Sequence, residues 1–194
     1  MKNIYLASRS PRRGEILSQL GISYEIMPSD VDESVLPDEE PDAYVMRLAK
    51  EKAEVCLKKI KKQKLKAIPV LAADTTVSMD GEILGKPESD EDAARMLRHM
   101  SGRSHWVYTA VAVGKGSKVE VMLSATMVCM AELTKEQIAA YVASGEPHDK
   151  AGAYGIQGMA STFIKRIDGS YSGVMGLPVF ETAELLKKFG ISVL

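Results

Sequence analysis

The feature that most constrains this sequence is the segment at residues 69–77, a continuous apolar run that stops abruptly at three polar residues, Asp74, Thr75 and Thr76. An unbroken apolar run of this length is typical of a strand buried on both faces, and such a strand needs helices on both sides of its sheet. The run therefore predicts a central strand of an α/β fold. The polar residues are expected to emerge at its carboxyl end, where ligands commonly bind.

Further strand patterns surround this run. Short β-type segments are expected at residues 4–7 and 24–31, and long ones rich in Val, Thr and Met at 105–114 and 119–132. Asp80-Gly81 favours a two-residue hairpin turn directly after the central strand, and residues 114–116 are expected to join the two long segments. A last strand is expected at 163–167, followed by a loop over 169–176.

Helices are predicted between these strands by apolar spacing and by capping residues. The segments are 11–20 with Ser10 as N-cap and Gly21 after its end, 41–59, 89–100 with a capping box of Ser89 and Asp92, 135–144 with a capping box of Thr134 and Gln137, and one beginning at Pro178. The alternation of strands and helices supports the α/β assignment.

Composition excludes several classes of protein. The 194 residues are expected to form one domain, or two lobes that share one sheet. With 25 Lys and Arg against 26 Asp and Glu, no global charge favours nucleic acid or an anionic membrane, and neither is expected as a partner. Neither a signal-peptide core nor a long apolar span is present, so we expect a cytoplasmic protein. The two cysteines fit a reducing compartment.

Several sequence signals for other chemistries are absent or weak. The three histidines lack zinc-binding spacing, and the chain has neither a P-loop string nor a G-x-S-x-G elbow. The lysine block at residues 58–66 could suggest a nucleic-acid patch, but no aromatic residues interleave with it and it follows a helix end. We interpret it as a solvated helix terminus.

The strongest local signal is the string Ser8-Arg9-Ser10-Pro11-Arg12-Arg13 between a strand and a helix. Free N–H groups at a helix start, two hydroxyls and paired guanidiniums suit phosphate oxygens. Arginines in a first turn oppose the helix dipole, so an anion is expected to offset that cost. The alternative is a capped helix whose arginines pair with the acids at positions 30, 32 and 33.

Asp74 is the second signal, because a carboxylate in an apolar strand must meet a cation, a metal or a set of hydrogen bonds. A role in catalysis or metal binding is predicted, with a turn role as the alternative. Glu33 is a candidate second carboxylate for a divalent ion. Lys52, Lys86 and Lys150 each could neutralise a polyphosphate. The glycine-rich loop at residues 145–158 also suggests a close backbone approach.

Taken in order, these strings resemble the Maf family of nucleoside triphosphate pyrophosphatases: LASRSPRR, AADTTV with GEILGKP, SGRSHWVYTAV, GEPHDKAGAYGIQG and GSYSGVMGLP. The sequence is similar to the dTTP/UTP pyrophosphatase branch, whose pattern has paired arginines, Asp-Thr and a glutamine in the Y-G-I-Q-G loop. The resemblance implies an elongated mixed β-sheet flanked by helices, in one domain over residues 1–194, with two lobes, a central cleft and an inosine-triphosphatase-like architecture.

The resemblance also implies hydrolysis of dTTP and UTP, and of modified pyrimidine nucleotides, to a monophosphate and pyrophosphate with Mg2+ or Mn2+. It implies that Asp74 is the proton acceptor and that Glu33 and Asp74 hold the metal. The remaining implied roles are base specificity for Arg12, Thr75 and Gln157, and phosphate binding for Ser8, Arg13, Lys52 and Lys86.

Three points stay open at the sequence level. Arg9 stands where the family often carries a small residue. The resemblance suggests a homodimer, although no apolar stripe in the chain demands one. It also leaves a further role in restraining septum formation, and the alternative function is a non-catalytic, nucleotide-binding regulator of cell division.

Overall fold

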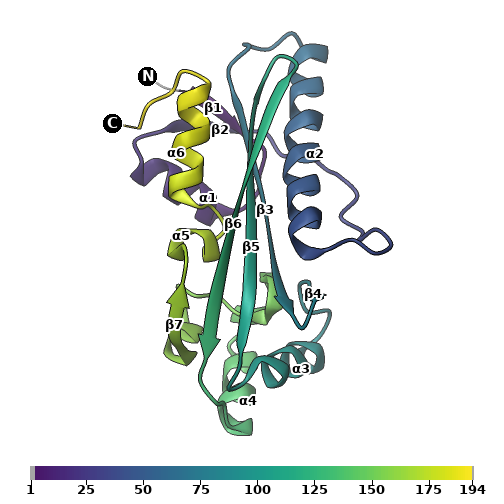
Figure 1. Cartoon of the computed structure of the whole chain (residues 1–194), viewed down its shortest axis with the longest axis vertical. Helices are drawn as coiled ribbons and strands as arrows, with labels where there is room; N and C mark the ends of the chain where they lie inside the picture. The colour runs from purple at the N-terminus through teal and green to yellow at the C-terminus, as the bar shows by residue number, and fades with distance from the viewer. Residues whose placement is uncertain (1–2, 194) are drawn as a thin grey trace.

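The fold is built on one seven-stranded mixed sheet that runs along the long axis of the molecule (Figure 1). The computed structural model describes residues 3–193. The strands lie in the order β2-β1-β3-β5-β6-β7, and β4 pairs with β3 outside this order. Helices cover both faces of the sheet, which confirms the predicted α/β class with an elongated mixed sheet flanked by helices.

The elements have the following bounds. The strands are β1 (Asn3–Leu6), β2 (Ser23–Ile26), β3 (Val70–Met79), β4 (Glu82–Leu84), β5 (Ser104–Lys115), β6 (Lys118–Met130) and β7 (Ile164–Asp168). The α-helices are α1 (Pro11–Gln19), α2 (Pro41–Lys62), α3 (Asp90–Met100), α4 (Lys135–Ala143), α5 (Tyr171–Val174) and α6 (Val179–Lys188). Three short 3-10 helices lie between α4 and β7: η1 (Glu146–Asp149), η2 (Ala151–Ala153) and η3 (Met159–Phe163).

The central strand β3 has different neighbours on its two sides. β5 pairs with it antiparallel over residues 70–78. On the other side, β1 pairs parallel with Val70 and Leu71, and β4 pairs antiparallel from Val77 onward. Within residues 3–193, no strand pairs with residues 72–76 on this side. The sheet therefore has a gap along this edge of β3, between β1 and β4.

Asp74, Thr75 and Thr76 lie in this gap. The prediction that they emerge at the carboxyl end of the strand is wrong, because β3 continues to Met79. β-branched threonines fit a strand well, so polar character alone does not end one here. What singles these residues out is the missing neighbour on one side, which opens that part of the strand to a ligand.

Alternation along β3 sends adjacent residues to opposite faces of the sheet. Ala72 belongs to the core cluster beneath α2, so Asp74 shares the α2 face. Leu71 and Ala73 belong to the cluster that contains residues of α1 and α6, so Thr75 shares that face. Both side chains line one cavity, which lies along the gap in the sheet edge.

α2 packs tightly on the sheet because the strand residues beneath it are small. Ala72, Ala110 and Ala112 form one core cluster with the apolar stripe of the helix, which includes Val45, Ala49, Ala53, Cys56 and Ile60. Small side chains let the helix axis approach the strands, so that Lys52 on the same helix reaches β3. A third cluster, with residues of α3, α4 and η2, covers the other end of the sheet. The division of residues 1–194 into one domain of two lobes stays a prediction.

Most predicted helix boundaries are confirmed, with two differences at the caps. Thr134 and Gln137 form the complete capping box, and Gly21 and Gly145 have the left-handed backbone expected after a helix. Ser10 occupies the N-cap of α1, but its side chain caps no N–H. At α3, Ser89 accepts from the Asp92 N–H as expected, whereas the Asp92 carboxylate accepts from the neighbouring Glu88 N–H instead of closing the box.

Two segments differ from the sequence predictions. The expected strand at residues 24–31 is short, since β2 ends at Ile26 and an extended acidic loop follows. The expected loop at 169–176 contains the one-turn helix α5, which Ser170 caps by accepting from the Gly173 N–H. α5 has only four residues, which are too few to show the apolar spacing by which a longer helix is predicted.

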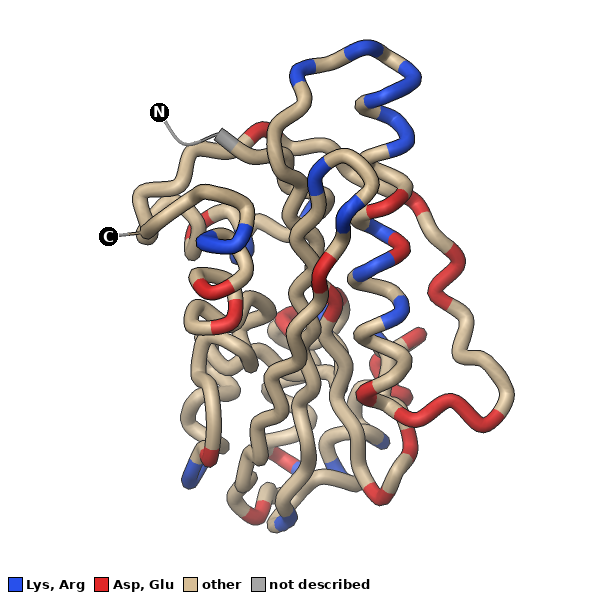
Figure 2. The backbone as a smooth tube through the Cα atoms, turned by 45° about the horizontal axis from the view of Figure 1, so that its top comes forward, with Lys and Arg blue, Asp and Glu red and all other residues tan. Residues whose placement is uncertain are grey.

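Charged residues gather in two places on the backbone (Figure 2). Lysines mark the carboxyl end of α2, where Lys58, Lys59, Lys61, Lys62, Lys64 and Lys66 are all exposed, in agreement with a solvated helix end. Acidic residues mark the loop between β2 and α2. No helix in residues 3–193 has the length and apolar character required to cross a membrane.

Candidate active site

A cavity of about 720 Å³ lies along the gap in the sheet, in the size range of small-molecule sites. A second cavity of about 680 Å³ adjoins it and shares several charged residues with it. Every site residue predicted from the sequence lines one of these two cavities: Ser8, Arg12, Arg13, Glu33, Lys52, Asp74, Thr75, Lys86 and Gln157. Residues far apart in the sequence thus face one space.

A lysine links the two predicted carboxylates. Lys52 Nζ lies 2.7 Å from Asp74 Oδ1 and 2.6 Å from Glu33 Oε1. The Asp74 and Lys52 side chains are about nine-tenths buried, whereas the Glu33 side chain is 58% exposed. This geometry confirms the expectation that the carboxylate in the apolar strand meets a cation. It places one buried and one solvated carboxylate on the same ammonium group.

The surroundings of the two carboxylates shift their pKa values in opposite directions. Burial raises the pKa of Asp74 above its ordinary value, and the charge and hydrogen bond of Lys52 oppose this rise without cancelling it. At Glu33, burial also acts to raise the pKa, but the hydrogen bond and charge of Lys52 outweigh it, so the pKa is lowered. A pair whose pKa values diverge in this way suits a proton acceptor beside a permanently charged carboxylate.

The loop that carries Glu33 is anchored to the first turns of α2. Tyr44 Oη donates to the Glu33 carbonyl oxygen at 2.9 Å. Arg47 donates to the Ser34 carbonyl oxygen at 3.0 Å and to both carboxylate oxygens of Glu39 at 2.6 and 2.7 Å. The Arg47 guanidinium also lies 5.6 Å from the centre of the Tyr44 ring, in a cation–π contact. These bonds hold the backbone at Glu33 over the cavity.

Arg13 connects three elements around the gap. Its Nη1 donates to Ser8 Oγ at 3.1 Å, its Nη2 to Thr75 Oγ1 at 3.3 Å and its Nε to the Gly176 carbonyl oxygen at 2.8 Å. Within the part of the chain that the structure describes, neither Arg12 nor Arg13 forms an ion pair with the acids at positions 30, 32 and 33, a pairing that the sequence left open. Instead, the exposed Arg9 pairs with Asp30.

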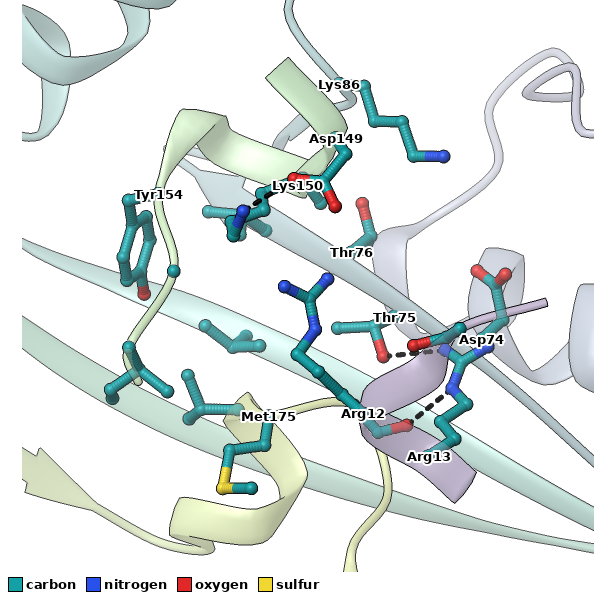
Figure 3. A pocket seen from close by; sticks show the side chains of 18 of the residues that line it. Arg12, Arg13, Asp74, Thr75, Thr76, Lys86, Asp149, Lys150, Tyr154 and Met175 are labelled. Carbon is teal, nitrogen blue, oxygen red and sulfur yellow. Dashed lines mark hydrogen bonds and ion pairs between the residues drawn. The ribbon is translucent and has the colours of Figure 1, made fainter. Parts of the chain in front are cut away.

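Arg12 and Lys86 are the cations that the protein leaves available. Both line the cavity, and neither forms a hydrogen bond or an ion pair with any residue in the 3–193 range. The close-up view shows Arg12 extending from α1 toward the 145–158 loop (Figure 3). Lys86 lies near Asp149 in the same view. A guanidinium and an ammonium without protein partners in a cleft suit phosphate oxygens or a base carbonyl.

The other end of the cavity has an apolar wall made by Val107, Tyr154, Ile156, Val174 and Met175. Behind it, the hydroxyl of Tyr154 lies 2.7 Å from Nε2 of the buried His105. Burial lowers the pKa of His105 to about 4, so its ring is neutral near pH 7. A flat apolar ring fits this wall, and the exposed Gln157 at its rim has an amide that can both donate and accept.

The 145–158 loop is held in place by Glu146. Tyr141 Oη donates to Glu146 Oε1 at 2.8 Å, and the Met159 N–H donates to Oε2 at 3.0 Å. Lys150, which the sequence suggested for phosphate charge, donates to the Glu146 carbonyl oxygen and to Asp149. The predicted close backbone approach is confirmed at Gly152, because a Cβ there would lie 2.8 Å from Val77 Cγ2.

The donor set suits a hard divalent cation that also binds the substrate. Among residues 3–193, no cluster of three or more His, Cys, Asp or Glu side chains forms a cage for a metal. Glu33 and Asp74 nevertheless present carboxylate oxygens to the same space. Mg2+ typically takes one or two carboxylates and completes its coordination with water and phosphate oxygens. The residues present therefore fit a metal that enters with a polyphosphate.

Sequence reasoning missed several residues that support the site. They are Tyr44, Arg47, Thr109, Glu146 and Tyr154. Each one forms a hydrogen bond that positions another residue or the backbone near the cavity, and three of them, Tyr44, Glu146 and Tyr154, also line the cavity. One of them could have been found from the sequence. Thr109 is a polar residue in a run of Val and Ala, and a polar side chain on a predicted buried face indicates a hydrogen-bond partner.

Comparisons with known proteins show which family and which sequences this chain resembles. The model of the family described as Maf-like protein matches residues 3–189. The chain is 58% identical to the dTTP/UTP pyrophosphatase of Methylobacillus flagellatus, over 100% of this chain and 96% of that protein. It is 57% identical to the one from Chromobacterium violaceum, over 98% and 96%, and 50% identical to the one from Escherichia coli O157:H7, over 97% and 94%.

Solved structures give a more distant likeness. The Ham1 protein of Staphylococcus aureus covers 70% of this chain and 88% of its own, with a TM-score of 0.46 and 16% identity.

Proposed function

This chain belongs to the Maf family of Maf-like proteins, and from that premise we propose that it is a nucleoside triphosphate pyrophosphatase that acts on dTTP and UTP. It hydrolyses the bond between the α- and β-phosphates and releases the nucleoside monophosphate and pyrophosphate. The observation that carries the proposal is the buried Asp74 carboxylate, which faces a cavity lined by cations at one end and by an apolar wall at the other.

The charged end of the cavity suits the triphosphate. Arg12, Arg13 and Lys86 line it, together with the Lys52 that pairs with the carboxylates. Guanidinium and ammonium groups offset the charge that builds up on phosphoryl oxygens during in-line attack. Ser8 supports this end by accepting hydrogen bonds from Arg13 and from the Ser10 N–H, which fixes the turn between β1 and α1.

Asp74 takes the proton of the attacking water. The water oxygen forms a bond to the α-phosphorus, the bond from that phosphorus to the bridging oxygen breaks, and pyrophosphate leaves with the bonding electrons. A general base works best when its pKa approaches the working pH, and burial moves the pKa of Asp74 in that direction. Lys52 holds the carboxylate in place and keeps it ionised until the proton arrives.

Glu33 and Asp74 are the residues that would hold Mg2+ or Mn2+. When bound, the cation would neutralise phosphate charge and orient the triphosphate. Tyr44 and Arg47 keep Glu33 at the cavity through the backbone of its loop.

The base rests against the apolar wall. Gln157 recognises the imide edge of uracil or thymine, because one amide supplies both the donor and the acceptor that this edge requires. Arg12 and Thr75 complete the specificity set, and a modified pyrimidine that keeps the imide edge is recognised in the same way.

Pyrophosphate release by the purified protein tests the proposal. We would assay the ribo- and deoxyribonucleoside triphosphates with Mg2+, with Mn2+ and with excess chelator, and use Asp74→Asn as the matched variant. The amide has the shape of the carboxylate but cannot accept the proton. We expect turnover of dTTP and UTP that the chelator abolishes, and a loss of at least about a hundredfold in Asp74→Asn with nucleotide binding retained.

Other outcomes would redirect the proposal. Binding of nucleotides without cleavage would favour the non-catalytic regulator of cell division, whereas equal turnover in Asp74→Asn would remove the assigned base. Sedimentation of the same preparation tests the homodimer. The homodimer, a role in septum formation and a cytoplasmic location stay predictions.

A further inference from the structure

Thr109 is a buried polar residue in the middle of the sheet. It lies on β5 directly opposite Thr75 on β3, and its side chain is completely buried. Directly paired residues of an antiparallel ladder point to the same face, so the two hydroxyl groups meet. Thr109 Oγ1 lies 3.0 Å from Thr75 Oγ1 and 2.8 Å from the carbonyl oxygen of Gly173 on α5.

The direction of these hydrogen bonds follows from counting hydrogens. A threonine hydroxyl has one hydrogen to donate, and a carbonyl oxygen can only accept. Between Thr109 Oγ1 and the Gly173 carbonyl oxygen, only Thr109 has a hydrogen to donate. The Thr109 hydrogen must therefore point to that carbonyl oxygen. The contact between the two threonines is then a hydrogen bond only if Thr75 donates to Thr109.

Arg13 provides the remaining hydrogen bond to the Thr75 hydroxyl. Its Nη2 donates to Thr75 Oγ1, and its Nε donates to the Gly176 carbonyl oxygen. The Gly176 N–H in turn donates to the Gly173 carbonyl oxygen at 2.9 Å. The bonds form a closed ring from Arg13 through Thr75, Thr109 and α5 and back to Arg13. In this ring the only hydrogen of the Thr75 hydroxyl points away from the cavity.

Thr75 stands where the two ends of the cavity meet. It is half-buried and lines the cavity, whereas Thr109 lies behind it and does not. A Cβ at Gly176 would lie 3.5 Å from Thr75 Oγ1, which places this hydroxyl beside the segment that contributes Val174 and Met175 to the apolar wall. We therefore expect a ring that rests on that wall to come within reach of the hydroxyl.

We propose that Thr109 is a positioning residue for base selection: it fixes the direction of the Thr75 hydroxyl, so that Thr75 presents only a lone pair to the base. This inference rests on the proposed function. Uracil and thymine carry a hydrogen on N3, which the lone pair of Thr75 accepts together with the amide oxygen of Gln157. Cytosine carries a lone pair on N3, which would face the lone pair of Thr75 and leave both without a partner.

Thr109→Val tests this role, because valine has the shape of threonine without the hydroxyl. The Thr75 hydrogen is then free to turn toward the cavity and donate to N3 of cytosine. We expect the ratio of kcat/KM for UTP over CTP to fall roughly fivefold to tenfold, the factor carried by one ordinary hydrogen bond. Thr109→Ser keeps the hydroxyl and should restore the ratio. Calorimetric binding of the α,β-methylene analogues of UTP and CTP should change in parallel.

The matched control is Thr182→Val. Thr182 is also completely buried, lies on α6, and its hydroxyl has no hydrogen-bond partner among the described residues. Removing that hydroxyl should leave the UTP-to-CTP ratio unchanged. If Thr109→Val does not fold, Thr109→Cys, with a weak S–H donor, takes its place.

A double variant separates the proposed route from a general loosening of the cleft. In a Thr75→Val background, Thr109→Val should have no further effect on the UTP-to-CTP ratio, because the hydroxyl that it controls is gone. An unchanged ratio in folded Thr109→Val, or an equal fall in Thr182→Val, would overturn the proposal. Failure of the proposed function itself would differ, since the unaltered protein would then neither cleave UTP nor bind its analogue.

Discussion

Lys52→Met removes the ammonium group that lies between the two carboxylates of the cleft and keeps the side-chain length nearly the same. In the present structure this group is 2.7 Å from Asp74 Oδ1 and 2.6 Å from Glu33 Oε1. Without it, burial, which is the largest influence raising the pKa of Asp74, is opposed only by the charge of Arg13, while the charge of Glu33 adds to the rise. The variant therefore makes Asp74 a carboxylate that ionises only at higher pH.

The size of the effect follows from the distance. Two unit charges 2.7 Å apart attract by about 1.5 kcal/mol in bulk water and by about 6 kcal/mol at an effective dielectric constant of about 20. One pKa unit corresponds to about 1.4 kcal/mol. Because the cavity opens to solvent beside Asp74, the lower part of this range applies. We expect the pKa of Asp74 to rise by about one to two units.

The assay is the pH dependence of kcat/KM for UTP, which reports the ionisation of the free enzyme. Asp74 acts as a base, so activity appears as the pH rises through its pKa, and the acidic limb should move to higher pH by about one to two units in Lys52→Met. Lost phosphate binding alone would lower activity at every pH and leave the limb in place.

Lys86→Met is the matched control, because it removes an ammonium group from the same cavity without breaking a bond to Asp74. It should lower kcat/KM with no shift of the acidic limb. An unmoved limb in Lys52→Met, or the same displacement in both variants, would refute the reasoning.

Two further predictions concern the base end of the cavity. Gln157→Glu sets a negative charge against a base carbonyl, so kcat/KM for UTP should fall about tenfold while ATP turnover changes little; equal losses for both nucleotides would show that Gln157 does not contact the base. The pKa of the buried His105 is lowered to about 4, so on acidification the unfolded chain takes up a proton that the folded protein refuses. Stability from this group is full above about pH 6.5 and is lost toward pH 4, by about 3 kcal/mol. Urea unfolding should show His105→Gln losing correspondingly less stability over that interval, and identical pH dependence in both proteins would contradict this account.

Most of the fold could be predicted from the sequence, because the signals for helices, strands and turns lie between residues close together in the chain. Capping boxes, glycines with left-handed backbone and the spacing of apolar residues located α1, α3 and α4 within a few residues. The long hairpin of β5 and β6 was equally visible from β-branched runs on both sides of one turn. The short elements β2 and α5 were misjudged, since a few residues do not establish a period.

The site residues that could be predicted are likewise those with a local signal in the sequence. Asp74, Arg12 and Arg13 could be recognised because a charge in an apolar strand, or a cation at a helix start, is costly on its own and points to a partner. Thr109 and Tyr44 carry no charge, so their local cost is smaller, and their roles depend on partners far away in the chain. The Glu33 carboxylate is one of many acids in its loop until the anchoring of that loop is known.

The sequence by itself determined the family, the order of strands and helices, and the residue types that the chemistry needs. Only the tertiary structure decided that Asp74 and Thr75 lie within a strand, at a gap that β1 and β4 leave open along the sheet edge. It also decided that Lys52 joins the two carboxylates and that Thr109 directs Thr75. The physical reason is that hydrogen-bond direction and ion pairing depend on groups brought together from distant segments, whereas helix caps and apolar periods are settled between near neighbours.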